Sequence, residues 1–156
     1  MRQVSAIFCD DVRQETSGKL IFIGVYTGTL IVPKLPTTLS KLCVLLTTVA
    51  PVDRPFKKLK MKIYKGLDVI SERAIPDEYL NPPELPLPPV DDEQLRTVME
   101  PMRMFRTQFT LSPLELNDRT FLRVRVETED EELKCPGLSI LELSDVQAED
   151  RPEAQS

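Results

Sequence analysis

The chain has 156 residues and a formal net charge of −5, with 41% hydrophobic and 29% charged residues. This composition is typical of one folded domain and argues against disorder of the whole chain. There is no histidine, so Ser-His-Asp and Cys-His arrangements and imidazole metal ligands are excluded. The acidic balance argues against nucleic acid as a partner.

Three widely spaced cysteines, Cys9, Cys43 and Cys135, form no CxxC motif. Their odd number argues against a disulfide framework and a structural zinc site, and we expect Cys9 and Cys43 to be small buried side chains. The first apolar stretch is too short for an export signal, and no run approaches the roughly 20 apolar residues of a membrane span. We therefore expect a cytoplasmic protein with no membrane contact.

Short apolar runs with a period of two predict β-strands along most of the chain. In chain order, the expected strands cover residues 4–9, 19–26, 29–32, 42–49, 58–64, 67–74, 105–111, 122–126 and 138–143. The run 42–49 is almost entirely apolar, which predicts a strand buried on both faces or central in its sheet. This rhythm indicates an all-β, antiparallel β-sandwich of about eight strands, with a layout similar to immunoglobulin-like or C2-like domains.

Helical periodicity occurs once, over residues 91–99, and predicts one short helix that crosses from sheet to sheet. Asp91 with Gln94 fits a capping box, and Pro101 stops the helix. The connection over residues 76–92 is rich in proline, so we expect a long, stiff, extended loop there.

The proline-rich loop has two interpretations. It can be a connector packed on the domain through Leu85 and Leu87, or a partner-binding loop with PxxP-like segments. Residues 144–156 contain one valine and no other bulky apolar group, which predicts a disordered acidic tail. The folded part is therefore expected to be a single domain over residues 1–143.

Five acidic residues fall between positions 127 and 132. Acidic loops at the end of a sandwich can bind Ca²⁺ through oxygen ligands, but the Asp-x-Asp-x-Asp-Gly pattern is missing. A solvated hairpin tip is the preferred interpretation, and a ligand- or calcium-binding domain is kept as an alternative.

Two basic stripes alternate with apolar residues: Lys58, Lys60 and Lys62 on one strand, and Arg123 and Arg125 on another. If these strands are neighbours, a positive sheet face results that can bind an acidic protein surface or a phosphate backbone. No aromatic residue is expected between them for base stacking. The structural alternative is pairing with acidic side chains of adjacent strands, or lysines that guard a sheet against aggregation.

A charged run follows the first strand: Asp10, Asp11, Arg13 and Glu15. The preferred interpretation is a solvated strand end whose carboxylates accept turn N–H groups or pair with arginine. Cation binding, or Cys9 as a nucleophile, are the alternatives. The thiol lacks the usual histidine base, so an enzyme with a carboxylate or cysteine mechanism is the last of the three functional hypotheses.

The same region reads A-I-F-C-D-D-V-R-Q-E over residues 6–15 and G-K-L-I-F-I-G-V-Y over residues 18–26. This resembles an uncharacterised family of small bacterial proteins with the pattern A-x-F-C-D-D-x-R-x-E…G-K-x-x-x-x-G-x-Y, over roughly the first 40 residues. The resemblance implies a bacterial origin and no catalytic residue, and it groups Gly24 and Tyr26 with the charged run. We expect Gly24 to let Tyr26 or another backbone approach closely.

No GxxxxGK[ST], GxGxxG, GxSxG or HExxH motif is present, so we expect no cofactor and no enzyme. The first hypothesis is a non-catalytic protein-binding or accessory module of a bacterial cell or prophage, with a protein partner or self-association through a sheet edge. The residues expected to contact a partner are Asp10, Asp11, Arg13, Glu15, Lys58, Lys60, Lys62, Arg123 and Arg125.

Overall fold

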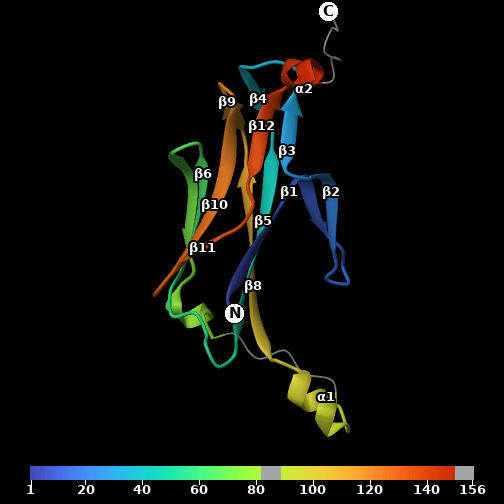
Figure 1. Cartoon of the computed structure of the whole chain (residues 1–156), viewed down its shortest axis with the longest axis vertical. Helices are drawn as coiled ribbons and strands as arrows, with labels where there is room; N and C mark the ends of the chain where they lie inside the picture. Colours follow the sequence, from blue (N-terminus) through green and yellow to red (C-terminus); the bar gives the residue numbers. More distant parts are fainter. Residues whose placement is uncertain (82–88, 150–156) are drawn as a thin grey trace, which may run out of the picture.

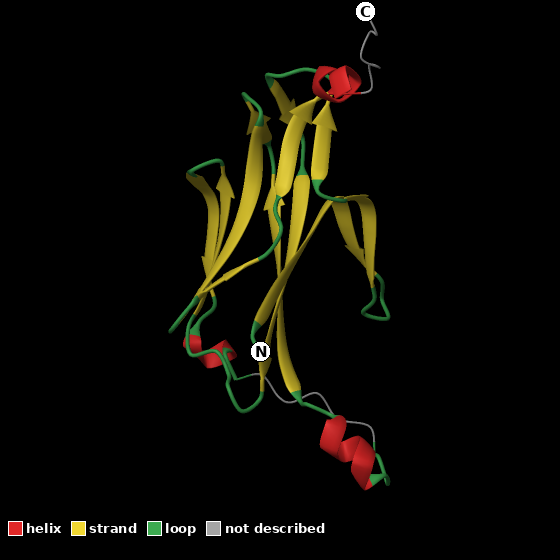
Figure 2. Ribbon diagram, in the orientation of Figure 1, coloured by secondary structure: helices red, strands yellow, loops and turns green. Residues whose placement is uncertain are grey.

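The computed structural model describes residues 1–81 and 89–149, and within them two β-sheets face each other (Figures 1 and 2). The first sheet has the strand order β2 (Leu20–Tyr26), β1 (Gln3–Gln14), β5 (Leu42–Pro51) and β8 (Met102–Leu111). The second has the order β3 (Thr29–Val32), β12 (Leu138–Glu142), β10 (Thr120–Thr128), β6 (Leu59–Lys65) and β7 (Asp68–Ala74), with β11 (Glu132–Lys134) also on β10. The predicted all-β sandwich is confirmed.

Two details differ from the expected arrangement of strands. The described residues form twelve strands, because β11, β4 (Thr37–Leu39) and β9 (Leu114–Leu116) are three-residue strands, too short to show a period of two. In addition, β3 pairs with β12 in parallel, whereas the other ladders are antiparallel.

The core is formed by the inward-facing residues of both sheets. β5 lies at the centre of the first sheet and contributes Leu42, Val44 and Leu46, while its outward-facing Cys43 and Leu45 are buried as well. The prediction that this apolar run is central and buried on both faces is confirmed. The second sheet contributes the following buried side chains: Leu30, Val32, Leu59, Met61, Ile63, Leu122, Val124, Val126, Leu138 and Ile140.

The predicted helix is α1 (Glu93–Val98), in the connection between β7 of one sheet and β8 of the other. Its N-cap is Asp92 rather than Asp91, because the Gln94 N–H donates to Asp92 Oδ1 at 2.8 Å. None of its residues is buried, and Figure 1 shows it at one end of the molecule.

The proline-rich connection is only partly extended. A 3₁₀ turn over Asp77–Tyr79 follows Pro76, and the next residue, Leu80, is buried in the core. This residue anchors the start of the loop to the sandwich. The predicted inward positions of Leu85 and Leu87 lie outside the described residues.

A second helix, α2 (Leu143–Glu149), follows β12, where the sequence predicts the start of a disordered tail. It is held by Asp145, which accepts from Arg119 Nε at 2.8 Å and from the Glu142 N–H at 2.9 Å. Residues 150–156 lie outside the described residues.

Candidate partner-binding site

The first group of predicted site residues lies where β1 leaves the sandwich: Asp10, Asp11, Arg13 and Glu15. β1 pairs with β5 from Gln3 to Cys9. Beyond Cys9, within the described part of the chain, it pairs with β2 alone, as far as the contact of Gln14 with Leu20. The two strands therefore continue as a two-stranded ribbon, the hairpin arm (residues 10–24), which Figure 1 shows at the side of the molecule.

The hairpin arm carries apolar side chains on both of its faces. Leu20 and Phe22 of β2, with Val12 of β1, are only half-buried on the face that continues the core. The opposite face carries Ile21 and Ile23. A two-stranded hairpin is marginally stable in water unless a third strand or a packed surface covers it. The arm is therefore the part of the fold that gains most from a further partner.

Three branched aliphatic residues form an exposed row along the outer face of β2, which we call the β2 row. Ile21, Ile23 and Val25 are 41%, 40% and 51% exposed. The register places them opposite Arg13, Asp11 and Cys9, so all six side chains share one face. The β2 row is not among the predicted site residues, because an entirely apolar strand is typical of a buried one.

Asp10 lies on the other face of the arm, and its side chain lies directly against Gly24 of β2. A Cβ atom on Gly24 would overlap the Asp10 carboxylate, and Gly24 has φ +66°, which side chains rarely adopt. Tyr26 Oη donates to Asp10 Oδ1 at 2.5 Å. Partial burial, together with this bond to a carboxylate, raises the pKa of Tyr26 to about 12. The sequence predicted that Gly24 would allow Tyr26 or another backbone to approach closely. The group that approaches is instead the Asp10 side chain of the neighbouring strand β1.

Asp11 and Arg13 form a local ion-pair chain at the border of the β2 row. Asp11 accepts from Lys41 Nζ at 2.7 Å and from Arg13 Nε at 3.2 Å. These two cations lower the pKa of the Asp11 carboxyl, and Asp11 raises that of Lys41. Glu15 lies in the turn, where its carboxylate accepts from Ser17 Oγ at 3.3 Å. The arm thus combines an apolar row with paired charges beside it.

The second group of predicted site residues comes together as expected, because β6 and β10 are neighbours and Lys62 faces Arg125. Each of the five cations nevertheless has a partner within the protein. Lys62 pairs with Glu127 at 2.6 Å and Lys60 with Glu72 at 2.7 Å, and looser pairs join Lys58 to Glu127 and Arg125 to Glu132, both at 3.7 Å. The hydrogen bond between Lys62 and Glu127 lowers the pKa of Glu127 and raises that of Lys62. Three carboxylates thus neutralise part of the charge of this face.

The expectation that no aromatic residue lies between the two basic stripes is wrong. Tyr64 follows Lys62 on the outward face of β6 and stands opposite Arg123. The Arg123 guanidinium lies 4.6 Å from the Tyr64 ring centre and 5.8 Å from that of Phe121, and it also donates to the Gly66 carbonyl oxygen at 2.9 Å. Two partly exposed rings thus hold the arginine by cation–π contact. The alternation along residues 58–64 already placed Tyr64 on the same face as the three lysines.

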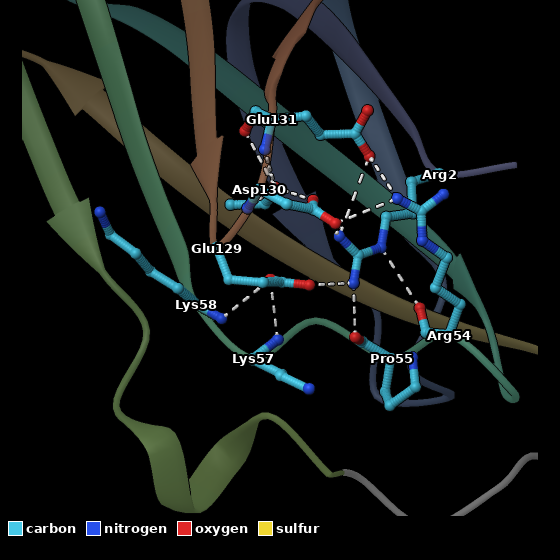
Figure 3. A network of polar contacts seen from close by, with 9 residues as sticks. Arg2, Arg54, Pro55, Lys57, Lys58, Glu129, Asp130 and Glu131 are labelled. Carbon is cyan, nitrogen blue, oxygen red and sulfur yellow. Dashed lines mark hydrogen bonds and ion pairs between the residues drawn. The ribbon is translucent and has the colours of Figure 1, made fainter.

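The acidic stretch 127–132 contacts a buried arginine, Arg2, which immediately precedes β1 (Figure 3). The Arg2 side chain is 1% exposed, and its guanidinium lies 4.9 Å from the Phe56 ring centre. It donates to Glu129, to Asp130 Oδ1 at 3.1 Å and to the Pro55 carbonyl oxygen at 2.6 Å. These contacts tie β1, the 51–58 connection and the β10–β11 turn together.

Glu129 is the central acceptor of this network. Burial alone would raise its pKa, but hydrogen bonds from Arg2 and from the backbone N–H groups of Lys57 and Lys58 outweigh burial and lower it to about 2. Arg54 also contacts Asp130, at 3.2 Å. The carboxylates that the sequence offered as calcium ligands are thus engaged by arginines and backbone amides, and among residues 1–81 and 89–149 no group of three or more acidic or cysteine side chains is arranged to hold a metal ion.

Cys9 and Cys43 have the predicted character of small buried residues. Cys9 and Cys43 face each other across β1 and β5 and are almost completely buried, and burial raises the pKa of the Cys9 thiol. All three cysteines are free. A buried thiol with a raised pKa is a poor nucleophile.

Comparison of the chain with protein-family models, with curated proteins and with solved structures gave no match. The resemblance seen in the first 40 residues therefore rests on the quoted pattern alone. Among the described residues, no helix combines the length and apolar character required to traverse a lipid bilayer.

The contact between Asp10 and Gly24 predicts an unequal effect of two glycine substitutions. Gly24→Ala should destabilise the arm by about 1–3 kcal/mol, because it adds a steric clash to the conformational penalty of a positive φ. Gly18→Ala, at φ +86° with no atom within 4 Å, carries the conformational penalty alone. Urea unfolding and amide exchange of the arm measure both, and Asp10→Ala should relieve part of the Gly24→Ala loss. Equal effects of the two alanines would contradict the contact.

The depressed pKa of Glu129 predicts acid sensitivity. A carboxyl whose pKa falls from 4.5 to about 2 on folding stabilises the protein above its unfolded pKa, by on the order of 3 kcal/mol, and this contribution disappears as the pH falls from about 5 to 2. Glu129→Gln should therefore be less stable than the natural protein near neutral pH and approach it in acid. Urea unfolding over this pH range tests this. Glu132→Gln, at the start of the adjoining strand β11, is the control, and an identical pH dependence for both variants would contradict the role of Glu129.

Proposed function

We propose that this protein is a non-catalytic protein-binding module and that the β2 row is its contact surface. The observation that carries the proposal is the row of Ile21, Ile23 and Val25, 40–51% exposed on β2, whose outer edge has no partner strand among the described residues. Contiguous apolar side chains on an exposed edge are typical of surfaces that associate with another chain.

The edges of β8, β7 and β3 support this choice by contrast. The edge of β8 is partly covered, because Arg73 of β7 donates to the Gln108 carbonyl oxygen at 3.3 Å and its guanidinium lies 5.0 Å from the Phe109 ring centre. β7 itself carries charged residues, and β3 has only four residues before Pro33. Short length, charge and proline are the usual protections of a sheet edge. β2 has seven residues, and none of them is charged or proline.

The surroundings of the β2 row also fit a binding surface. Protein interfaces have an apolar centre and a polar rim whose charges are satisfied. Asp11, Arg13 and Lys41 form such a rim beside Ile21 and Ile23. The predicted partner-contacting residues of the first group thus flank the proposed surface rather than form its centre.

The alternatives have less support. The buried Cys9 thiol and the largely paired carboxylates do not favour an enzyme, and the engagement of Glu129 and Asp130 by Arg2 does not favour calcium binding. A bacterial or prophage origin and a cytoplasmic location remain predictions from the sequence.

Site-specific photocrosslinking tests the proposal. A benzophenone amino acid in place of Ile23 should give covalent protein adducts when the full chain is illuminated in cells that naturally produce it. The same group in place of Ile31, which is 46% exposed on β3, is the matched control. Mass spectrometry identifies the adducts. Failure to form adducts at position 23, or the same adducts at both positions, would contradict the proposed surface.

A further inference from the structure

We infer that the partner of the β2 row is a second copy of this chain, and that two β2 strands pair antiparallel across a two-fold axis at Ile23. This inference rests on the proposed function, because it names the partner of the same surface. It follows from the self-complementarity of one short strand, which is a requirement of every two-fold symmetric interface.

The symmetry of β2 defines the register. The strand runs over seven residues, Leu20–Tyr26, and its central residue is Ile23. Antiparallel pairing about this residue uses the whole strand and leaves no overhang. It places Ile23 opposite Ile23 of the second copy, and Ile21 opposite Val25 of the second copy.

Side chains on both faces fit this register. On the outer face, the three aliphatic residues of each copy would form one continuous apolar band, since paired residues in a ladder share a face. On the other face, Phe22 stands opposite Gly24 of the second copy, and an aromatic side chain opposite a strand glycine is a favourable cross-strand pair. Leu20 meets Tyr26.

Charge does not oppose the pairing. β2 contains no charged residue, so no like charges stand opposite each other within the seven paired positions. Lys19, which precedes the strand, would face Thr27 of the second copy. Asp11 and Arg13 lie one strand farther back and are already paired with each other.

The stability that further strands give to a two-stranded ribbon explains why the arm would pair with a second copy. Beyond Cys9 the arm is a ribbon of two strands, and a third or fourth strand with an apolar face is what makes such a ribbon stable. Pairing of two arms creates a four-stranded ribbon and joins the two first sheets through their β2 edges. It also places the β2 rows of both copies side by side, where cross-strand neighbours cover part of each side chain.

Sedimentation equilibrium of the purified full chain over a range of concentrations tests the inference. The natural chain should dimerise reversibly. Ile23→Lys should raise the dissociation constant by about a hundredfold or more, because it places two ammonium groups face to face at the axis. Ile31→Lys, at an equally exposed isoleucine of the other sheet, should leave the dimer unchanged. Circular dichroism checks folding, and Ile23→Ser serves as a milder second variant.

A charge pair tests the register. Ile21→Lys or Val25→Glu alone should weaken the dimer by about tenfold, whereas the double variant Ile21→Lys/Val25→Glu places opposite charges across the interface twice and should recover much of the loss. Recovery by the double variant supports the axis at Ile23. A double variant weaker than both single variants would overturn this register.

A chain that stays monomeric at every concentration, or a dimer that survives both Ile23→Lys and Ile23→Ser, would overturn the inference. The proposed function is judged separately by the adducts formed at position 23. Adducts with a different protein, combined with a monomeric purified chain, would refute self-association and leave the protein-binding role intact. The absence of any adduct would remove both.

Discussion

The burial of apolar side chains between the two sheets is the constraint on which this structure depends, and it ends abruptly along β1. As far as Cys9, this strand pairs with β5, is joined by β2 from Phe8 onward, and contributes Phe8 to the core. From Asp10 onward it pairs only with β2 in the part of the chain that the structure describes. The same strand thus belongs to a stable sandwich in its first half and to a marginal ribbon in its second. The proposed binding surface lies where the interior of the sandwich no longer covers the chain.

Charged groups in this protein mostly serve to hold its own parts together. Arg2 has ion-pair contacts with three carboxylates and stacks on the Phe56 ring. On the basic face of β6 and β10, Glu72, Glu127 and Glu132 pair with four of the five cations. The gain from each pair is reduced by the desolvation of its charges, so pairs that also accept backbone N–H groups, as Glu129 does, contribute most. The charged surfaces are thus accounted for by contacts within the protein. The apolar β2 row is not, among the residues that the structure describes.

Much of the fold was predictable from the sequence, because alternation of apolar and polar residues depends on which face is buried. This alternation predicted the long strands, including β5, which is buried on both faces. It also indicated that Lys62 and Arg125 would be close if their strands were neighbours. It could not place three-residue strands, nor the carboxylate partners of Arg2, since contacts over more than 120 positions leave no local pattern. The β2 row could not be recognised because β2 and β5 both consist almost entirely of apolar residues. The distinguishing signal lay in the hairpin partner: the residues after Cys9 are charged, so a strand paired with them cannot face the core on both sides.

The long-range partners of Arg2 also determine at what stage of synthesis the two sheets can pack together. During synthesis β1 emerges first, but the carboxylate of Glu129 follows 127 residues later. β3 likewise waits for β12, and β5 for β8. Folds dominated by such distant pairings are slow to form, since loop closure precedes the contacts that reward it. The first hairpin is therefore the first element of this sheet that a ribosome-bound chain can assemble, and β5 can join it through β1 before β8 is made. The apolar β2 edge of this hairpin stays exposed to the cell during that interval.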